Sequence, residues 1–161
     1  DIRISLIDKC NFRCTYCMPK TVFDDNYQFL GNKDLLTFEE VVFISSAFIK
    51  LGAEKLRLTG GEPLLRKNVE DLIKVLANLR TIERKPVEIA LTTNGTLLFG
   101  KAQSLFDAGL QRITVSLDSL NQEIFEAISD TNFSVKEILK GIDHAKKIGL
   151  EVKVNMVVRK G

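Results

Sequence analysis

Five segments of the chain alternate apolar and polar residues with a period of two, which is the pattern of strands that bury one face. In the second of them, Leu56 and Leu58 share the apolar side and Arg57 lies on the opposite, polar side. The alternation predicts five strands with one apolar and one polar face each. They span residues 2–7, 55–59, 87–92, 112–117 and 151–158.

Helical segments lie between these strands, with apolar residues recurring every three or four positions along one face. Each such helix has one side to bury against the sheet. The sequence also marks where the helices are expected to begin and end. The expected first residues are the capping boxes Thr37 with Glu40 and Ser134 with Glu137 and the N-caps Asn68 and Asn121, and the expected stops are Gly52 and Gly149.

Strands and helices alternate along the whole chain, which is typical of an α/β fold with a parallel sheet. Because the apolar helix stripes must cover the apolar strand faces, the polar faces are left to line the inside. A closed eight-stranded barrel fills its interior with Val, Ile and Leu, so a polar lining predicts an open partial (β/α) TIM-like barrel with about five of six βα units. A doubly wound sheet with solvated strand-end charges is the alternative. We expect residues 1–161 to form one partial-barrel domain, the N-terminal part of a longer protein.

Composition and charge narrow the range of partners. A chain of 161 residues with 45% hydrophobic residues can bury one substantial core. Its net charge of +2 provides no general attraction for nucleic acid, and no apolar run reaches the roughly 20 residues of a membrane span, so neither partner is expected. On the polar strand faces, basic residues outnumber acidic ones, which predicts an anionic ligand inside the barrel. These basic residues are Arg3, Lys55, Arg57, Arg112 and Lys153.

The three cysteines of the chain, Cys10, Cys14 and Cys17, lie together in the loop that follows the first strand. The carboxyl ends of strands are where α/β folds place their active sites. An odd, clustered set is a poor disulfide framework and indicates a reducing, cytoplasmic setting. Three thiolates can hold a 4Fe-4S cluster and leave one iron open for a ligand. A zinc site completed by a partner and three metal-free reactive thiols are the alternatives.

The spacing CxxxCxxC of these cysteines, with the aromatic Tyr16 before the last one, resembles the signature of radical S-adenosylmethionine (radical SAM) enzymes. The second strand is followed by GGEP at residues 60–63, similar to the element with which that family holds the methionine end of S-adenosylmethionine (SAM). Glycine suits such a contact because a ligand can approach its backbone closely. The resemblance implies a 4Fe-4S cluster on Cys10, Cys14 and Cys17, with SAM as the second cofactor.

Within these enzymes, the chain most resembles the GTP 3′,8-cyclases of molybdenum cofactor biosynthesis, the MoaA family. Nearly the whole chain takes part, including DKCNFRC at 8–14, LTGGEPL at 58–64, TTNG at 92–95 and VSLD at 115–118. The resemblance implies conversion of GTP into 3′,8-cyclo-7,8-dihydro-GTP through a 5′-deoxyadenosyl radical. It also implies an external electron donor and is compatible with a homodimer. By position, Tyr16, Gly61 and Ser116 would contact SAM, and Arg3, Arg57, Thr92 and Lys153 would contact GTP.

The polar strand faces found from the periodicity contain Ser116 and all four residues implied to contact GTP. Lys55 and Arg112 share these faces and are expected to form ordinary salt bridges. The sequence identifies no catalytic acid or base. The MoaA family carries a second cysteine triplet in its C-terminal part, and the cysteines here account only for the first. Another radical SAM enzyme acting on a peptide or a small molecule, and a non-catalytic metal-binding module, are the alternative functions.

Overall fold

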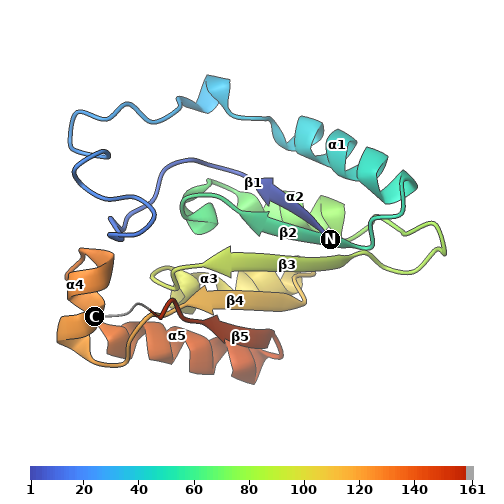
Figure 1. Cartoon of the computed structure of the whole chain (residues 1–161). Coiled ribbons are helices and arrows are strands. Elements are labelled where there is room, and N and C mark those ends of the chain that lie inside the picture. Colours follow the sequence, from blue (N-terminus) through green and yellow to red (C-terminus); the bar gives the residue numbers. More distant parts are fainter. Residues whose placement is uncertain (159–161) are drawn as a thin grey trace.

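The computed structural model describes residues 1–158, which form a five-stranded parallel sheet with helices packed against it (Figure 1). Residues 159–161 of the predicted domain lie outside the described part. All five predicted strands are confirmed, although four of them differ from the prediction at one or both ends. The strands are β1 (Ile2–Ser5), β2 (Lys55–Thr59), β3 (Glu88–Thr93), β4 (Arg112–Ser116) and β5 (Glu151–Asn155).

The strands lie side by side in the same order as they follow one another in the chain, β1-β2-β3-β4-β5. Every connection therefore steps to the next strand in the same direction, whereas a doubly wound sheet reverses direction at a switch point. The doubly wound alternative is wrong, and the open partial barrel is confirmed. All strand arrows point to one edge of the sheet, and the loop after β1 and helix α4 (Gln122–Ser129) lie at that edge (Figure 1).

Helices α2 (Val69–Leu76), α3 (Leu98–Asp107) and α5 (Val135–Ile148) cover one face of the sheet, behind the strands in Figure 1. The core lies between these helices and the apolar strand faces, where Leu56, Ile89 and Ile113 are completely buried. No described helix combines the length and apolar character that a membrane crossing requires. The chain also contains helix α1 (Phe38–Lys50) and two short 3-10 turns, η1 (Asn32–Asp34) and η2 (Pro63–Leu65).

Two of the expected helix starts are confirmed in detail. The hydroxyl of Thr37 accepts a hydrogen bond from the Glu40 amide at 3.2 Å, and the Glu40 carboxylate accepts one from the Thr37 amide at 2.7 Å. This reciprocal pair satisfies two free N–H groups at the start of α1. At the start of α4, the side chain of Asn121 accepts a hydrogen bond from the Ile124 amide at 3.1 Å.

Ser134 and Asn68 stand at the N-cap positions as predicted, but neither side chain forms the expected capping hydrogen bond. The Ser134 side chain makes no capping hydrogen bond, and Gln122 instead accepts from the Val135 amide at 2.9 Å. Asn68 precedes α2 in a left-handed conformation (φ 60°) and also makes no side-chain cap. At the other end of α5, Gly149 adopts φ 113°, which confirms it as a helix stop.

Candidate functional site

The three cysteines meet the glycines of the GGEP segment in one pocket of about 380 Å³ at the carboxyl edge of the sheet. Cys10, Cys14 and Cys17 all line this pocket, and Gly60 and Gly61 form another part of its wall. All three cysteines are free thiols, with Cys17 exposed and the other two half-buried. Two motifs that are separated by more than 40 positions in the chain therefore form a single site.

Arg13 stabilises the conformation of the cysteine loop. Its guanidinium donates to the carbonyl oxygens of Cys10 at 2.8 Å, Phe12 at 2.9 Å and Phe23 at 2.9 Å. It also lies 5.4 Å from the ring centroid of Phe29, within the range of a cation–π contact. The sequence does not reveal this role, because two of the four partners, Phe23 and Phe29, lie outside the cysteine motif.

The thiols oppose one another's ionisation. Burial, and then the neighbouring charges of Cys17 and Cys10, raise the pKa of Cys14 to about 12. Burial likewise raises the pKa of Cys10, although hydrogen bonds from the Phe12 amide and from Asn94 Nδ2, at 3.8 Å from the sulfur, act in the other direction. A cationic centre that binds all three sulfurs would reverse this balance and favour the thiolates.

The donor set therefore suits an iron-sulfur cluster, whose irons are held by cysteine thiolates. Within residues 1–158, no three His, Cys, Asp or Glu side chains converge to hold one metal ion. A zinc ion would need its sulfurs at about 2.3 Å from a single point, whereas a cluster takes each thiolate on a different iron.

The GGEP segment packs backbone to backbone against the residues that follow β1. The Gly61 amide donates to the Ile7 carbonyl at 2.6 Å, and the Glu62 amide donates to the Lys9 carbonyl at 2.9 Å. A Cβ atom at Gly61 would overlap the carbonyl oxygen of Lys9, so only glycine fits there. This close approach fixes the glycines beside the cysteine loop.

Hydrogen bonds of Glu62 link the end of β2 to the end of β3. Its carboxylate accepts hydrogen bonds from the Asn94 amide at 2.7 Å, the Thr93 hydroxyl at 2.8 Å and the Leu64 amide at 3.0 Å. The side chain is almost completely buried, and this burial raises its pKa. The sequence gives the residue as part of a motif but does not reveal this bridging role.

Tyr16 and Ser116, the other two residues implied to contact SAM, are not among the residues lining the pocket. The Tyr16 hydroxyl donates to Asp118 Oδ2 at 2.8 Å, and Asp118 Oδ1 accepts from the Val157 amide at 2.9 Å. Burial, followed by this contact with Asp118, raises the pKa of Tyr16. Asp118 thus connects the cysteine loop to the end of β4, where Ser116 is the last residue of the strand.

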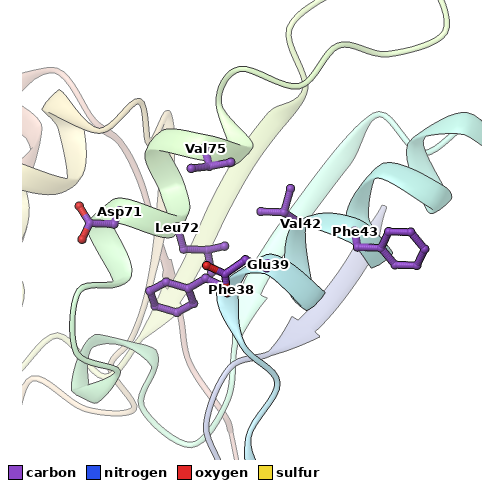
Figure 2. A pocket seen from close by; sticks show the side chains of 7 residues that line it. All are labelled: Phe38, Glu39, Val42, Phe43, Asp71, Leu72 and Val75. Carbon is purple, nitrogen blue, oxygen red and sulfur yellow. The ribbon is translucent and has the colours of Figure 1, made fainter.

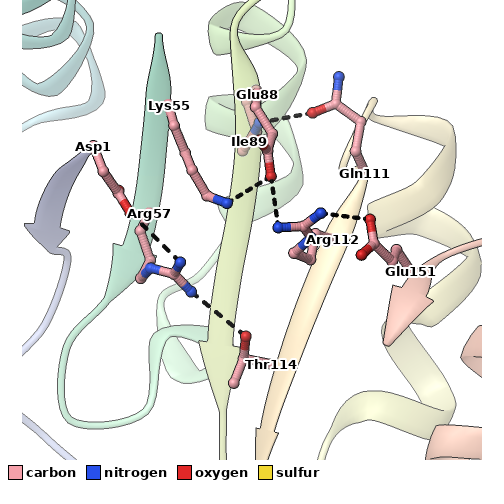
Figure 3. Close-up of polar contacts among 9 residues, drawn as sticks. All are labelled: Asp1, Lys55, Arg57, Glu88, Ile89, Gln111, Arg112, Thr114 and Glu151. Atoms are coloured by element: carbon pink, nitrogen blue, oxygen red, sulfur yellow. Dashed lines mark hydrogen bonds and ion pairs between the residues drawn. The ribbon is translucent and has the colours of Figure 1, made fainter. Parts of the chain in front are cut away.

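The four residues implied to contact GTP lie on neighbouring strands of the same sheet. Arg3 pairs in register with Arg57, and Lys153 pairs with Thr114, which is itself the register partner of Thr92. Arg57 reaches across β3 to the Thr114 hydroxyl at 3.5 Å (Figure 3). The structure therefore brings these four residues together on the polar face of the sheet.

The other two basic residues of that face are engaged in ion pairs, as expected. Lys55 lies 2.7 Å from the Glu88 carboxylate, and Arg112 bridges Glu88 at 3.2 Å and Glu151 at 2.7 Å (Figure 3). These contacts compensate the two cations locally and leave them less free to bind an external anion.

Three basic residues remain with little compensation. Among the described residues, the one ion pair of Arg57 is a 3.6 Å contact with Asp1, and its buried Nε has no hydrogen-bond partner there. Arg3 and Lys153 form no ion pair within the described part of the chain. They are the same three cations that the family resemblance assigns to GTP.

A second hollow lies between α1 and α2 (Figure 2) and shares no lining residue with the cysteine pocket. Its volume is about 490 Å³, larger than that of the cysteine pocket, but it contains no residue predicted to carry chemistry. Its wall is mainly apolar and is formed by Phe38, Glu39, Val42, Phe43, Asp71, Leu72 and Val75. Size alone therefore does not identify the functional site.

Comparison of the sequence with known proteins identifies the family of the chain. The profile of the Radical SAM superfamily matches residues 4–161. A GTP 3′,8-cyclase from Staphylococcus haemolyticus (strain JCSC1435) is 53% identical over all 161 residues, which cover 46% of that protein. The chain thus spans about half the length of the curated relatives that it matches.

Solved structures share the fold at lower sequence identity. HydG, a maturase of the FeFe-hydrogenase, superposes with a TM-score of 0.74 at 16% identity, covering 96% of this chain and 34% of HydG. Native anSMEcpe with bound AdoMet gives a TM-score of 0.70 at 20% identity, covering 94% of this chain and 42% of the other. At this level of identity, both comparisons concern the fold alone.

Proposed function

The chain belongs to the Radical SAM superfamily, and from this premise we propose that Cys10, Cys14 and Cys17 bind a 4Fe-4S cluster with SAM beside it. The observation that carries the proposal is the pocket that the three cysteines line together with Gly60 and Gly61. Three ligands from one loop leave one corner of a cluster without a protein donor, which is where a small ligand can bind.

We assign SAM contacts to Tyr16, Gly61 and Ser116. Gly61 presents backbone at the pocket wall, where a side chain would not fit. Tyr16 is held by Asp118 at the end of β4, near the position of Ser116. When bound, the two cofactors supply a 5′-deoxyadenosyl radical by one-electron cleavage of SAM, and the protein positions the reactants and excludes water.

We further propose that the substrate is GTP and that the reaction is 3′,8-cyclisation. The names of the relatives at about 50% identity support this choice, and so does the set of uncompensated cations on the polar sheet face. Arg3, Arg57 and Lys153 would bind the phosphates, because guanidinium groups donate paired hydrogen bonds to phosphate and lysine contributes a point charge. Thr92 would donate or accept a further hydrogen bond. A neutral peptide would leave these cations without a partner.

Because the matched relatives are about twice as long, we propose that residues 1–161 correspond to the N-terminal partial-barrel part of such an enzyme. The proposal includes an external electron donor, since the one-electron cleavage needs a reductant. The homodimer and the cytoplasmic location stay predictions.

Anaerobic reconstitution with iron and sulfide tests the proposal. We expect iron and sulfide to bind in the ratio of one 4Fe-4S cluster per chain, and SAM to change the electron paramagnetic resonance spectrum of the reduced cluster. Under a low-potential reductant, 5′-deoxyadenosine should form from SAM. A cluster that forms but whose spectrum does not change on addition of SAM would support the metal-binding module instead. Binding of SAM without binding of GTP would support a radical SAM enzyme with another substrate.

A further inference from the structure

Asp8 carries a carboxylate oxygen that has no hydrogen-bond partner among residues 1–158. It lies three residues beyond β1, and its Oδ2 accepts a hydrogen bond from the Leu30 amide at 2.8 Å. Its Oδ1 is buried and forms no hydrogen bond, and no cation of the described residues pairs with it. A buried carboxylate oxygen without a donor is costly, so such an atom requires an explanation.

The surroundings of Asp8 indicate what could satisfy this oxygen. Asp8 lines the same pocket as the three cysteines and the two glycines of the GGEP segment. That segment is hydrogen-bonded to the residues on either side of Asp8, through the carbonyls of Ile7 and Lys9. The unpaired oxygen therefore belongs to the stretch of chain that directly faces Gly60 and Gly61.

A carboxylate oxygen at this place can only accept, and its charge favours a cationic or strongly polarised N–H donor. The ligand proposed for this pocket brings one such donor, the α-amino group of an amino acid. It also brings a carboxylate, which Asp8 would repel. Asp8 would thus select the orientation in which the amino end, rather than the carboxylate, points at residues 7–9.

We infer that Asp8 Oδ1 accepts a hydrogen bond from the α-amino group of the methionine moiety of SAM, while Oδ2 anchors the 19–31 loop through Leu30. This inference rests on the proposed function and adds to it a side chain that fixes the direction of the methionine end. No motif in the sequence indicates this role.

The substitution Asp8→Asn separates the two functions of the carboxylate. The asparagine oxygen can still accept from the Leu30 amide, so the loop anchor is kept, while the other position becomes an NH₂ donor facing the ligand's amino group. Asp24→Asn is the matched control: Asp24 lies in the same loop and accepts from the Asn26 amide at 3.0 Å, but does not line the pocket. Both variants lose one negative charge.

Binding is measured by calorimetry on the cluster-loaded chain, with S-adenosylhomocysteine and with an analogue in which hydrogen replaces its α-amino group. We expect Asp8→Asn to weaken S-adenosylhomocysteine about tenfold or more, as for loss of a charge-assisted hydrogen bond, and to leave the desamino analogue within about twofold. Asp24→Asn should change neither. Iron and sulfide content should match the wild type in both variants.

Three results would overturn the inference. If Asp8→Asn binds both compounds as the wild type does, Oδ1 has no ligand contact. If it weakens both equally, Asp8 acts only by anchoring the loop. If the cluster-loaded wild type binds neither S-adenosylhomocysteine nor SAM, the proposed function itself fails, and the inference fails with it.

Discussion

The contact between Tyr16 and Asp118 joins residues 102 positions apart in the chain. Tyr16 belongs to the loop with the cysteines, while Asp118 follows β4 and also binds the Val157 amide beyond β5. One carboxylate thus fixes an aromatic ring relative to two strand ends. If Tyr16 contacts SAM, the hydrogen bond positions its ring for that contact.

The first prediction concerns this pair. We expect Tyr16→Phe and Asp118→Asn each to weaken SAM binding about three- to tenfold, the effect of one net hydrogen bond. The double variant should be no weaker than the stronger single variant, because both changes remove the same interaction. Calorimetry on the cluster-loaded protein measures this, and Tyr27→Phe, the other tyrosine, is the control. Additive losses would contradict a positioning role for the pair.

The role of a residue can be predicted from the sequence where it depends on local spacing, as it does for the cysteines and Gly61. Asp8 and Asp118 both lie in segments that resemble the family, yet nothing in those segments indicates what they bind. Their partners are the Leu30 amide and the Tyr16 hydroxyl, 22 and 102 positions away. Such pairs become visible only when the chain is folded.

The second prediction concerns Glu88, which is flanked by Lys55 and Arg112. The hydrogen bond from Lys55, followed by the charges of both cations, lowers the pKa of this carboxyl. A lowered pKa in the folded state means that the ionised form adds stability above the usual Glu value of about 4.3, and that this stability is lost as the pH falls through the folded pKa.

We therefore expect Glu88→Gln to lower the free energy of unfolding at pH 7 by less than about 1 kcal/mol, since the pair is partly exposed to solvent. The difference from the wild type should shrink as the pH falls below about 4. Urea unfolding at several pH values measures it, with Glu83→Gln in the surface pair with Lys85 as the control. A difference in the free energy of unfolding between wild type and Glu88→Gln that grows at acid pH would contradict this prediction.

At the scale of elements, α1 and α5 provide a comparison between two predicted capping boxes. Thr37 makes the reciprocal hydrogen bonds of a box at α1, whereas Ser134 makes none at α5. The third prediction is that Thr37→Ala lowers the free energy of unfolding by about 1 kcal/mol, while Ser134→Ala changes it by less than about 0.3 kcal/mol. Urea unfolding of both variants measures the difference. Equal losses would mean that the Ser134 side chain caps α5 in solution.

The existence and order of the elements follow from periodicity, but the detail at their ends does not. Every predicted strand is present, because the alternation of Leu56 with Arg57 and its counterparts requires a sheet with one buried face. The predicted capping box at α5 does not form: the Glu137 amide, which such a box would use, donates to the Ser134 carbonyl at 3.1 Å, and the Val135 amide donates to Gln122 of α4 at 2.9 Å. The contact with Gln122 comes from a different helix, and local spacing holds no information about it.

At the scale of the whole molecule, the parallel orientation of the strands places all their carboxyl ends at one edge of the sheet, and their sequential order makes the sheet an open partial barrel. This order could be anticipated from the polar faces of all five strands, since a closed barrel would bury apolar residues there. Ion pairs of Lys55 and Arg112 were expected, but the partners of these two cations could not be anticipated. Glu88 and Glu151 compensate Lys55 and Arg112, and this follows only from the register of neighbouring strands.

The last prediction compares Arg57 with the ion-paired Lys55 to test the assignment of GTP. Arg57→Gln and Lys55→Gln remove the same charge from the same strand, so a purely long-range field would make them equivalent. Direct contact makes them unequal, because Lys55 is already bound to Glu88 whereas Arg57 has only a long contact with Asp1.

We expect Arg57→Gln to raise the dissociation constant of GTP about tenfold or more, and Lys55→Gln to raise it less than about threefold, in keeping with a lost charge-assisted phosphate contact in the first case only. Guanosine, which lacks phosphate, should bind both variants alike. Titrations at low and high salt separate the two effects, because the long-range part is screened and the contact between Arg57 and phosphate is less so. Equal losses of GTP affinity in the two variants would show that Arg57 acts through net charge, and would remove the main structural support for a phosphate site on this sheet.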